Sequence, residues 1–234
     1  AIATYGLSKR FEGHIAVNEI DLRIKKGEVY GLIGPNGAGK TTLIRMLAAA
    51  EEPTKGEIYI DGDRLLRDDS NPRLKKRLGY LPDDFPLYDD LTVWDYLDYF
   101  ARLYNLKQPS RRRRLVEVLE LVQLENKRKS IISTLSRGMK QRLSLARTII
   151  HEPILLLLDE PFGSLDTGTR QRMQGLFKKL AGEFEITSLF VTHDLKEAVL
   201  MGDEIGFMQA GSLKVYKDKD RFIADPETGV QDEI

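Results

Sequence analysis

The sequence predicts an α/β protein whose mostly parallel sheet is interrupted by an inserted helical region. Three observations support this prediction. Residues 154–158 and 188–192 are continuous apolar runs, which are typical of strands buried on both faces of a parallel sheet. Residues 29–33 form a third apolar run, and a glycine-rich loop joins it to a helical pattern. Between about 91 and 150 the pattern is helical, so we expect one α/β core with a helical insertion.

The composition narrows the class of protein. The 234 residues contain 36 Lys and Arg against 36 Asp and Glu, and this zero net charge argues against a nucleic-acid binder held by a large basic surface. Hydrophobic residues make up 41% and charged residues 31% of the chain, as in a soluble globular protein. Because the chain has no Cys, disulfide scaffolds, thiolate zinc sites and thiol catalysis are excluded.

Two features of the sequence indicate a cytoplasmic protein. The longest purely apolar run, 154–158, falls far short of the roughly 20 residues that a membrane-spanning helix needs. The N-terminus reaches Lys9 and Arg10 too early for a signal peptide. We therefore expect the chain to lie in the cytoplasm.

Two further strand signals flank the core pattern. Residues 57–62 alternate in polarity and stop at an Asp-Gly pair, as an antiparallel strand with a tight turn does. Residues 205–209 and 213–216 flank an Ala-Gly-Ser segment and predict a hairpin near the C-terminus.

Two helices of the insertion have recognisable starts. One is expected to begin with Ser110 as its N-cap and the other near Ser136, each followed by apolar residues on one face. The four Arg residues 111–114 are expected to form a solvated helix face. The alternative interpretation is a contact with acidic lipid or nucleic acid.

Residues 34–41 match the pattern G-x-x-x-x-G-K-[ST], in the strand-to-helix context that this pattern requires. Glycines let backbone N–H groups turn toward phosphate oxygens, and the following helix directs the positive end of its dipole at them. Lys40 would reach the β- and γ-phosphates, and the Thr41 hydroxyl would bind Mg²⁺. The alternative is an ordinary glycine-rich turn. We expect the nucleotide-binding residues to be Gly34, Pro35, Asn36, Gly37, Ala38, Gly39, Lys40, Thr41 and Thr42.

Two carboxylates follow the apolar run 154–158. Asp159 and Glu160 would lie at the carboxyl end of that strand, where open α/β sheets bind their ligands. Asp159 suits the Mg²⁺ shell of a P-loop protein, and Glu160 could polarise an attacking water as a general base. The alternative is that both acids only cap the turn at Pro161.

His193 follows another apolar strand and is one of three His residues. A neutral imidazole there can hydrogen-bond the γ-phosphate and an attacking water without adding charge, although a lone His is more often structural. Gly34, Asp159 and His193 would meet at one edge of the sheet, which favours a catalytic role for His193. For His14 and His151 we expect structural roles.

One more motif completes the set. Residues 135–139 read Leu-Ser-Arg-Gly-Met and precede a helical pattern. With them, residues 1–216 resemble the nucleotide-binding subunit of the ATP-binding-cassette (ABC) transporter family. The P-loop, Q-loop position, LSGGQ-like signature, Walker B acid, D-loop (Ser164-Leu165-Asp166) and His193 occur in the family's order.

The resemblance implies a P-loop NTPase fold with a RecA-like core, an N-terminal antiparallel β-subdomain and an inserted α-helical subdomain. Residues 1–234 would form a single ABC ATPase domain. Residues 1–83 and 151–234 would be its nucleotide-binding core, and 84–150 its helical subdomain with the signature.

The resemblance also implies a head-to-tail dimer, in which each ATP lies between one P-loop and the opposite signature. Ser136 and Gly138 would bind ATP in trans: a Ser can N-cap a helix whose N–H groups hold phosphate, and a Gly permits close backbone approach. Phe11 occupies the position of an aromatic that stacks on adenine; a core Phe is the alternative. Asp166 would contact the partner's P-loop region.

The sequence departs from the family pattern in two motifs. Asp83 occupies the position of the Q-loop glutamine. A carboxylate there could bind Mg²⁺ more strongly, or leave the metal shell to water. In the signature, Arg137 and Met139 replace the first Gly and the Gln, whereas Ser136 and Gly138 are retained.

The resemblance implies ATP hydrolysis coupled to membrane transport, with ATP and Mg²⁺ as cofactors. The expected partners are a second copy or a homologous ATP-binding subunit, and transmembrane permease subunits that hold the chain on the cytoplasmic face of the cell membrane. No nucleic-acid partner is expected. A soluble ABC ATPase of a cytoplasmic assembly machine is the alternative, and the cargo and the direction of transport stay open.

Aromatic residues gather in the first part of the insertion. They can form the core of the helical subdomain, or border a groove that accepts a short helix of the transmembrane subunit. The group consists of Phe85, Tyr88, Trp94, Tyr96, Tyr99, Phe100 and Tyr104.

Overall fold

The computed structural model describes residues 1–66, 72–84, 86–163 and 165–230. Phe85 of the aromatic group and Ser164 of the D-loop lie outside the described residues. Within the described ranges the strands are β1 (Ile2–Phe11), β2 (His14–Ile20), β3 (Arg23–Ile24), β4 (Val29–Ile33), β5 (Lys55–Ile60), β6 (Asp63–Arg64), β7 (Leu78–Leu81), β8 (Leu155–Asp159), β9 (Thr187–Thr192), β10 (Glu204–Gln209) and β11 (Ser212–Tyr216). The helices are α1 (Lys40–Leu47), α2 (Pro72–Lys75), α3 (Val93–Leu103), α4 (Ser110–Leu121), α5 (Arg137–Ile149), α6 (Thr167–Phe184), α7 (Leu195–Met201) and α8 (Lys219–Ala224), with 3₁₀ turns η1 (Glu125–Lys127), η2 (Ile132–Thr134) and η3 (Pro226–Thr228).

The main sheet has the strand order β11-β10-β4-β9-β8-β7 in the described part of the chain. Strands β10, β4, β9, β8 and β7 run parallel, and only the hairpin partner β11 is antiparallel. Every residue of β4, β8 and β9 is buried, which confirms the prediction of strands covered on both faces. The carboxyl ends of β4, β8 and β9 therefore share one edge of the sheet.

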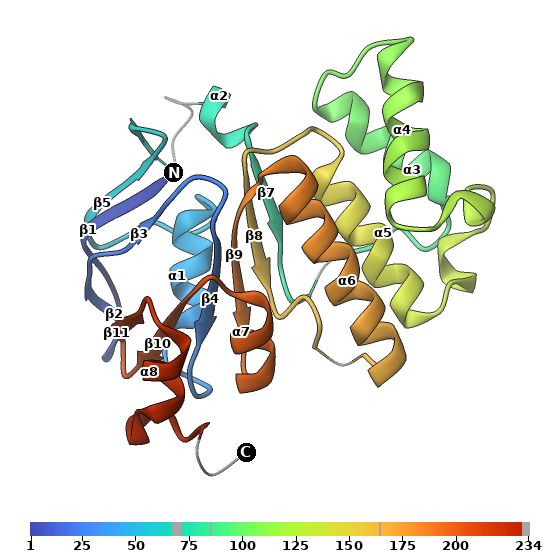
Figure 1. Cartoon of the computed structure of the whole chain (residues 1–234). Helices are drawn as coiled ribbons and strands as arrows, with labels where there is room; N and C mark the ends of the chain where they lie inside the picture. The colour runs from blue at the N-terminus through green and yellow to red at the C-terminus, as the bar shows by residue number, and fades with distance from the viewer. Residues whose placement is uncertain (67–71, 85, 164, 231–234) are drawn as a thin grey trace.

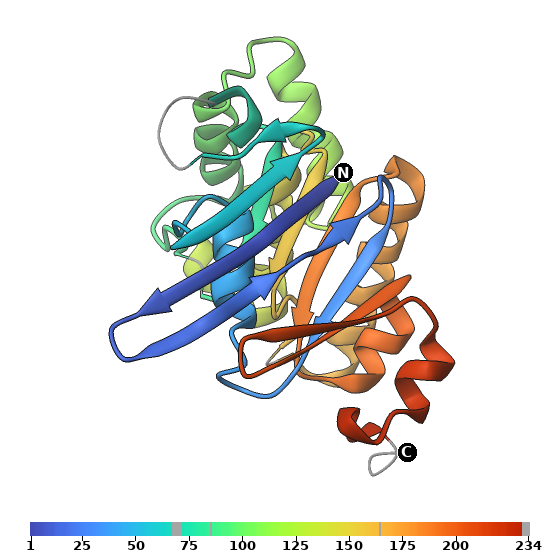
Figure 2. The same ribbon diagram turned by 90° about the vertical axis from the view of Figure 1, so that its left-hand side faces the viewer.

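A second, antiparallel sheet, formed by the N-terminal strands, lies on the α1 side of the main sheet. Its order is β2-β1-β5-β6, with β3 paired to β1. Helix α1 lies between the two sheets, as Figures 1 and 2 show from perpendicular directions, whereas α6 and α7 cover the opposite face of the main sheet. Alternation along β8 follows these layers: Leu155 and Leu157 pack in the cluster around α1, and Leu156 and Leu158 in the cluster around α6.

Helices α3, α4 and α5 form the insertion between β7 and β8 and extend to one side of the core (Figure 1). Their apolar faces share one cluster, in which Tyr96 of the aromatic group is fully buried. Tyr88 and Tyr99 are 45% and 46% exposed. The core interpretation therefore holds for Tyr96 and not for these two rings.

One of the two predicted helix starts in the insertion is wrong. Ser136 is the N-cap of α5, as predicted, but Ser110 is the first helical residue of α4 and not its N-cap. The preceding Pro109 already has right-handed helical backbone angles and occupies the cap position, without a side-chain hydrogen bond.

The arginine run is not a uniformly solvated face. The guanidinium of Arg111 forms an ion pair with Asp98 of α3 at 2.8 Å. Arg114 donates hydrogen bonds to the carbonyl oxygens of Ile149 and Ile150 at the end of α5, at 2.7 and 3.1 Å. Arg111 and Arg114 are three residues apart and therefore lie on the same side of α4, which faces α3 and α5. Of the four arginines, the two between them, at 112 and 113, are exposed.

Candidate nucleotide-binding site

The loop between β4 and α1 has a backbone path that glycine alone allows at two positions. Gly34 has φ of +156° and Gly39, the N-cap of α1, has φ of +104°. A Cβ at Gly34 would collide with the carbonyl oxygen of Met208, and one at Gly39 with that of Ala16. The loop is thus held between β10 and β2, and its glycines are required by close packing as well as by φ.

The loop retains unused hydrogen-bond donors. Within the described residues, the backbone N–H groups of Gly37 and Gly39 make no hydrogen bond, although the N–H of Ala38 between them donates to Pro35 at 3.1 Å. Backbone donors without acceptors beside a helix N-terminus are suited to phosphate oxygens. Their arrangement supports the predicted phosphate cradle.

The other predicted residues of the loop lie where a bound nucleotide could reach them. Pro35, Asn36 and Gly37 are exposed, and Ala38 is buried. Thr42 is half-buried in the first turn of α1.

Lys40 is a buried cation inside this loop. It is 6% exposed, and its Nζ donates to the carbonyl oxygens of Gly34 and Pro35 at 2.6 and 3.0 Å. Burial lowers the pKa of Lys40, and the nearby carboxylates of Glu160 and Asp159 oppose that shift. A phosphate would provide the buried ammonium with a full negative charge in place of carbonyl dipoles.

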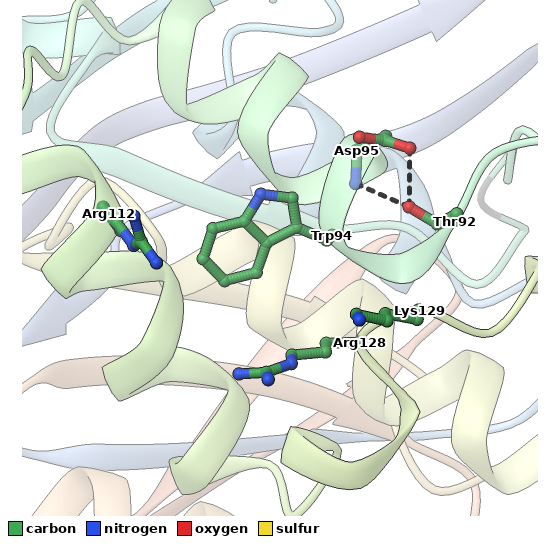
Figure 3. A pocket seen from close by; sticks show the side chains of 6 residues that line it. All are labelled: Thr92, Trp94, Asp95, Arg112, Arg128 and Lys129. Atoms are coloured by element: carbon green, nitrogen blue, oxygen red, sulfur yellow. Dashed lines mark hydrogen bonds between the residues drawn. The ribbon is translucent and has the colours of Figure 1, made fainter.

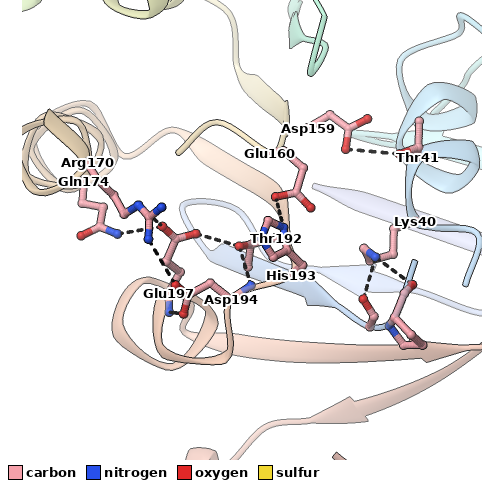
Figure 4. A network of polar contacts seen from close by, with 12 residues as sticks. Lys40, Thr41, Asp159, Glu160, Arg170, Gln174, Thr192, His193, Asp194 and Glu197 are labelled. Atoms are coloured by element: carbon pink, nitrogen blue, oxygen red, sulfur yellow. Dashed lines mark hydrogen bonds and ion pairs between the residues drawn. The ribbon is translucent and has the colours of Figure 1, made fainter. Parts of the chain in front are cut away.

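Asp159 ends β8 beside the first turn of α1. It is 2% exposed, and the Thr41 hydroxyl donates to its Oδ1 at 3.5 Å (Figure 4). Burial, followed by the charges of Asp83 and Glu160, raises the pKa of Asp159 to about 6, against the opposing effects of Thr41 and Lys40. The structure therefore places Asp83 close enough to Asp159 for their charges to interact.

These oxygen atoms suit Mg²⁺. A buried carboxylate next to a hydroxyl, with other carboxylates nearby, is a set of hard oxygen donors, and a cation would relieve the repulsion that raises the pKa of Asp159. No cluster of three or more His, Cys, Asp or Glu in the described ranges is arranged to hold a metal by itself. Mg²⁺ usually keeps one or two protein ligands and completes its shell with phosphate and water. The residues present fit that arrangement, in which Thr41 and Asp159 would be the protein ligands.

The raised pKa of Asp159 predicts a pH-dependent stability. The folded chain holds this proton up to about pH 6 and the unfolded chain only to 3.8, so stability falls as the pH rises between these values. Asp159→Asn removes the effect. Urea denaturation without nucleotide or Mg²⁺ should show the variant to be more stable at pH 7 by on the order of 2 kcal/mol, with little difference near pH 4. An equal gain at both pH values would contradict this origin.

Glu160 and His193 lie in contact at the same sheet edge (Figure 4). The imidazole Nδ1 is 2.9 Å from Oε2 of Glu160, and because a carboxylate only accepts, the ring is the donor. Glu160 has a left-handed backbone, with φ of +48°, and its N–H donates to Val191 of β9 at 3.0 Å. Non-glycine residues in this region cost free energy, and such strain collects at functional sites.

A second polar network, which no pattern in the sequence predicts, holds the turn that carries His193. Glu197 of α7 is 5% exposed and accepts hydrogen bonds from Thr192 at 2.7 Å and from Gln174 of α6 at 3.1 Å. Arg170 of α6 lies 3.7 Å from the same carboxylate (Figure 4). The only signal in the sequence is an acid four residues after His193, which reads as an ordinary helix residue.

The signature residues lie on the insertion, at the start of α5. Ser136 accepts a hydrogen bond from the backbone N–H of Met139 at 3.3 Å, as an N-cap does. Gly138 faces α6, where a Cβ would collide with the side chain of Thr169. Among the described residues, no hydrogen bond or ion pair joins Ser136 or Gly138 to the P-loop. The single chain therefore presents these residues on a separate surface.

Two other predicted residues also lie at the surface. Phe11 ends β1, is 39% exposed, and stacks with His14 at a ring distance of 5.8 Å. Asp166 is the N-cap of α6 and accepts a hydrogen bond from the N–H of Thr169 at 3.0 Å.

Two His residues have the structural contacts expected of them. His151 packs face to face with Tyr104 at 3.8 Å, and its Nε2 is 2.8 Å from the Leu78 carbonyl. His14 starts β2, pairs with Phe11 of β1 and stacks on its ring.

The fold and this site together define a nucleotide-binding cassette of the P-loop class. A family model described as ABC transporter matches residues 17–163. The chain is 34% identical over 227 residues to the spermidine/putrescine import ATP-binding protein PotA of Protochlamydia amoebophila, a match covering 94% of this chain and 60% of that protein. It is 35% identical over 214 residues to a probable sulfate/thiosulfate import ATP-binding protein, CysA of Chlorella vulgaris, over 91% of this chain and 89% of that protein.

Solved structures agree with the sequence relatives. The dimeric, post-hydrolysis state of an ATP-binding cassette bound to ADP and Pi superposes with a TM-score of 0.82 at 29% identity, covering 93% of this chain and 98% of that one. The chain belongs to the ABC transporter family, and its fold is the ABC ATPase fold. It spans 60% of the length of its PotA relative. In the described part of the chain, no helix combines the length and the apolar character needed to cross a bilayer.

Proposed function

We propose that this chain is the ATP-binding and ATP-hydrolysing subunit of a multi-subunit ABC membrane transporter. The observation that carries the proposal is the meeting of Lys40, Asp159 and the Glu160–His193 pair at one edge of the parallel sheet. They follow the ends of three strands, β4, β8 and β9, and together they supply a phosphate cradle, a metal ligand and a proton acceptor.

The residues act in the following order. The unpaired N–H groups of the P-loop and the Lys40 ammonium bind the β- and γ-phosphates of ATP. Thr41 and Asp159 would hold Mg²⁺, which would screen the phosphate charge and polarise the γ-phosphoryl group. Glu160 accepts a proton from a water aligned with the γ-phosphate, and His193 orients Glu160 through its Nδ1–H. Release of phosphate then removes the charge that held Lys40 away from its loop carbonyls.

A dimer completes the site. Ser136 and Gly138 stand at the N-terminus of α5, whose helix dipole favours a phosphate provided by another subunit. Asp166 would approach the P-loop region of the partner, and Phe11 would stack on the adenine. The partner is a second copy or a homologous subunit. The dimeric form of the ADP-bound cassette that this chain resembles supports this arrangement.

Transport requires separate permease subunits, which would hold the chain on the cytoplasmic face of the membrane. The exposed ring of Tyr88 stacks on Phe100 of α3 at 6.3 Å, and the exposed ring of Tyr99 meets Phe100 edge-on at 5.3 Å. These rings offer an apolar face to a helix of such a subunit. Both named relatives are import proteins, which favours import. One is named for spermidine/putrescine and the other for sulfate/thiosulfate, at nearly equal identity to this chain, so identity at this level does not fix the cargo.

The experiment that tests the transport role is fractionation of the tagged chain from its native cell. Recovery in washed, detergent-solubilised membranes together with a multi-span polypeptide would support it. Recovery only with soluble partners would instead identify a soluble ABC ATPase of a cytoplasmic assembly machine, with the same ATP chemistry.

Replacing Asp83 should separate metal dependence from nucleotide affinity. Asp83→Gln removes a negative charge next to Asp159. We expect the Mg²⁺ concentration for half-maximal ATPase activity to rise at least about threefold, because one nearby carboxylate is lost, while ATP affinity changes less than about threefold. Asp84→Asn, at the exposed neighbouring position, is the matched control. Collapse of ATP binding in Asp83→Gln would show that Asp83 has another role.

A further inference from the structure

The helical insertion contains a pocket that the ATPase cycle does not use. This Trp94 pocket has a volume of about 540 Å³ and lies between the start of α3, the helix α4 and the segment after η1. In Figure 3 the guanidinium group of Arg112, on α4, lies to the left of the Trp94 indole, and that of Arg128, on that segment, lies below it. The lining residues are Thr92, Trp94, Asp95, Arg112, Arg128 and Lys129.

The cations of this pocket have no partners among the residues that the structure describes. Arg112, Arg128 and Lys129 are exposed, and their side chains make no hydrogen bond or ion pair with any part of the chain that the structure describes. Arg111 and Arg114, in the same run as Arg112, are both paired. The pocket therefore gathers around one aromatic ring three positive charges that make no ion pair with the described residues.

The single carboxylate in the pocket does not neutralise these cations. Asp95 accepts a hydrogen bond from the Thr92 hydroxyl at 2.7 Å, and its own backbone N–H donates to the Thr92 oxygen at 3.1 Å. This reciprocal pair caps α3. The carboxylate is thus engaged in helix capping, and the pocket keeps an excess of positive charge.

Backbone hydrogen bonds hold the floor of the pocket in place. The N–H of Val93 donates to the backbone carbonyl oxygen of Ser130 at 3.0 Å, and the N–H of Trp94 donates to that of Arg128 at 2.9 Å. The first N–H groups of α3 are therefore already used, and no backbone cradle is left for a compact phosphate. The charges that are available are separated side chains arranged around an indole.

We propose that the Trp94 pocket binds an acidic peptide segment of another polypeptide. The guanidinium forks of Arg112 and Arg128 match the planar geometry of carboxylates, and Lys129 adds a third positive charge. An apolar side chain of the same peptide would pack on the indole of Trp94. Trp and Arg are the residue types that contribute most often to binding hot spots. This inference does not rest on the proposed transport role.

Trp94 reports directly on this pocket, because it is the only Trp of the chain. The full-length protein is titrated with a blocked peptide of sequence Glu-Glu-Leu-Phe-Glu-Asp-Glu while indole emission is recorded. A saturable change in emission is expected, weakened at least about tenfold in half-molar salt. The same peptide with Gln and Asn in place of its acids should produce no saturable change.

Charge reversal locates the binding. The variant Arg112→Glu with Arg128→Glu should weaken binding of the acidic peptide at least about tenfold, since both guanidinium contacts are lost. Arg113→Glu with Lys127→Glu is the matched control: the same charge change on α4 and at the end of η1, next to the two substituted positions, at exposed residues that do not line the pocket. Circular dichroism and ATP binding confirm that both variants are folded.

Three outcomes would overturn the proposal. One is equal weakening by both double variants, which would indicate long-range attraction and no defined site. Another is a response to inorganic phosphate as strong as to the peptide. The third is a change in emission with phosphatidylglycerol vesicles alone, which would make the pocket a lipid-binding surface.

Discussion

Glu160→Gln should lower the rate of ATP hydrolysis by about 10²- to 10⁴-fold, the range that a general base contributes. The substitution keeps the size of the side chain and an oxygen that can accept from His193, which lies 2.9 Å away. It removes the negative charge that draws a proton from water. Phosphate release per chain, measured with excess ATP and Mg²⁺, is the primary measurement.

The same variant should accumulate as an ATP-bound dimer. If each ATP is held between Lys40 of one subunit and Ser136 of the other, a subunit that binds and does not hydrolyse remains closed. Light scattering with saturating ATP should then show twice the monomer mass, and ADP should not. Glu183→Gln, at an exposed position of α6, is the control and should leave both activity and mass unchanged.

A monomeric Glu160→Gln protein at saturating ATP would contradict the composite site. Such a result would not affect the assignment of Glu160 as the general base, because ATP turnover and dimerisation are measured separately.

Local sequence predicts the site where one segment provides both its fold and its chemistry. The run 29–33, the P-loop and α1 follow one another directly, so the strand, the phosphate cradle and the helix are specified by consecutive residues. The same holds for Asp159, whose position follows from the five buried residues of β8. Ser136 is predicted as an N-cap because its hydrogen bond is made three residues away.

Contacts between segments that are far apart in the sequence could not be predicted. Glu197 meets Gln174 across 23 positions, and no pattern in either helix indicates that they pair. Arg111 and Arg114 fail the prediction of a solvated face for the same reason, since their partners lie on α3 and α5. A charged side chain is assigned to solvent by default, and only tertiary packing brings an acceptor to it.

The largest structural effect is expected from Gly39. At φ of +104° a non-glycine residue is strained, and the added Cβ of Gly39→Ala would also collide with the Ala16 carbonyl and approach Cε of Met208 to 2.8 Å. A backbone carbonyl in a paired strand cannot move aside as a flexible side chain does. We therefore expect the P-loop to separate from β2, with a loss of stability on the order of 3 kcal/mol and of measurable ATP binding.

Gly37→Ala is the matched comparison, because it isolates the effect of φ from that of packing. Gly37 has φ of +79°, and a Cβ there has no atom within 4 Å. Its cost should be only about 1 kcal/mol, the strain of a left-handed residue. Urea denaturation without nucleotide measures both variants free of any effect on binding. Equal destabilisation of the two would show that backbone conformation alone requires glycine in this loop, whereas a larger loss for Gly39→Ala locates the constraint at the contact between the P-loop and the antiparallel sheet.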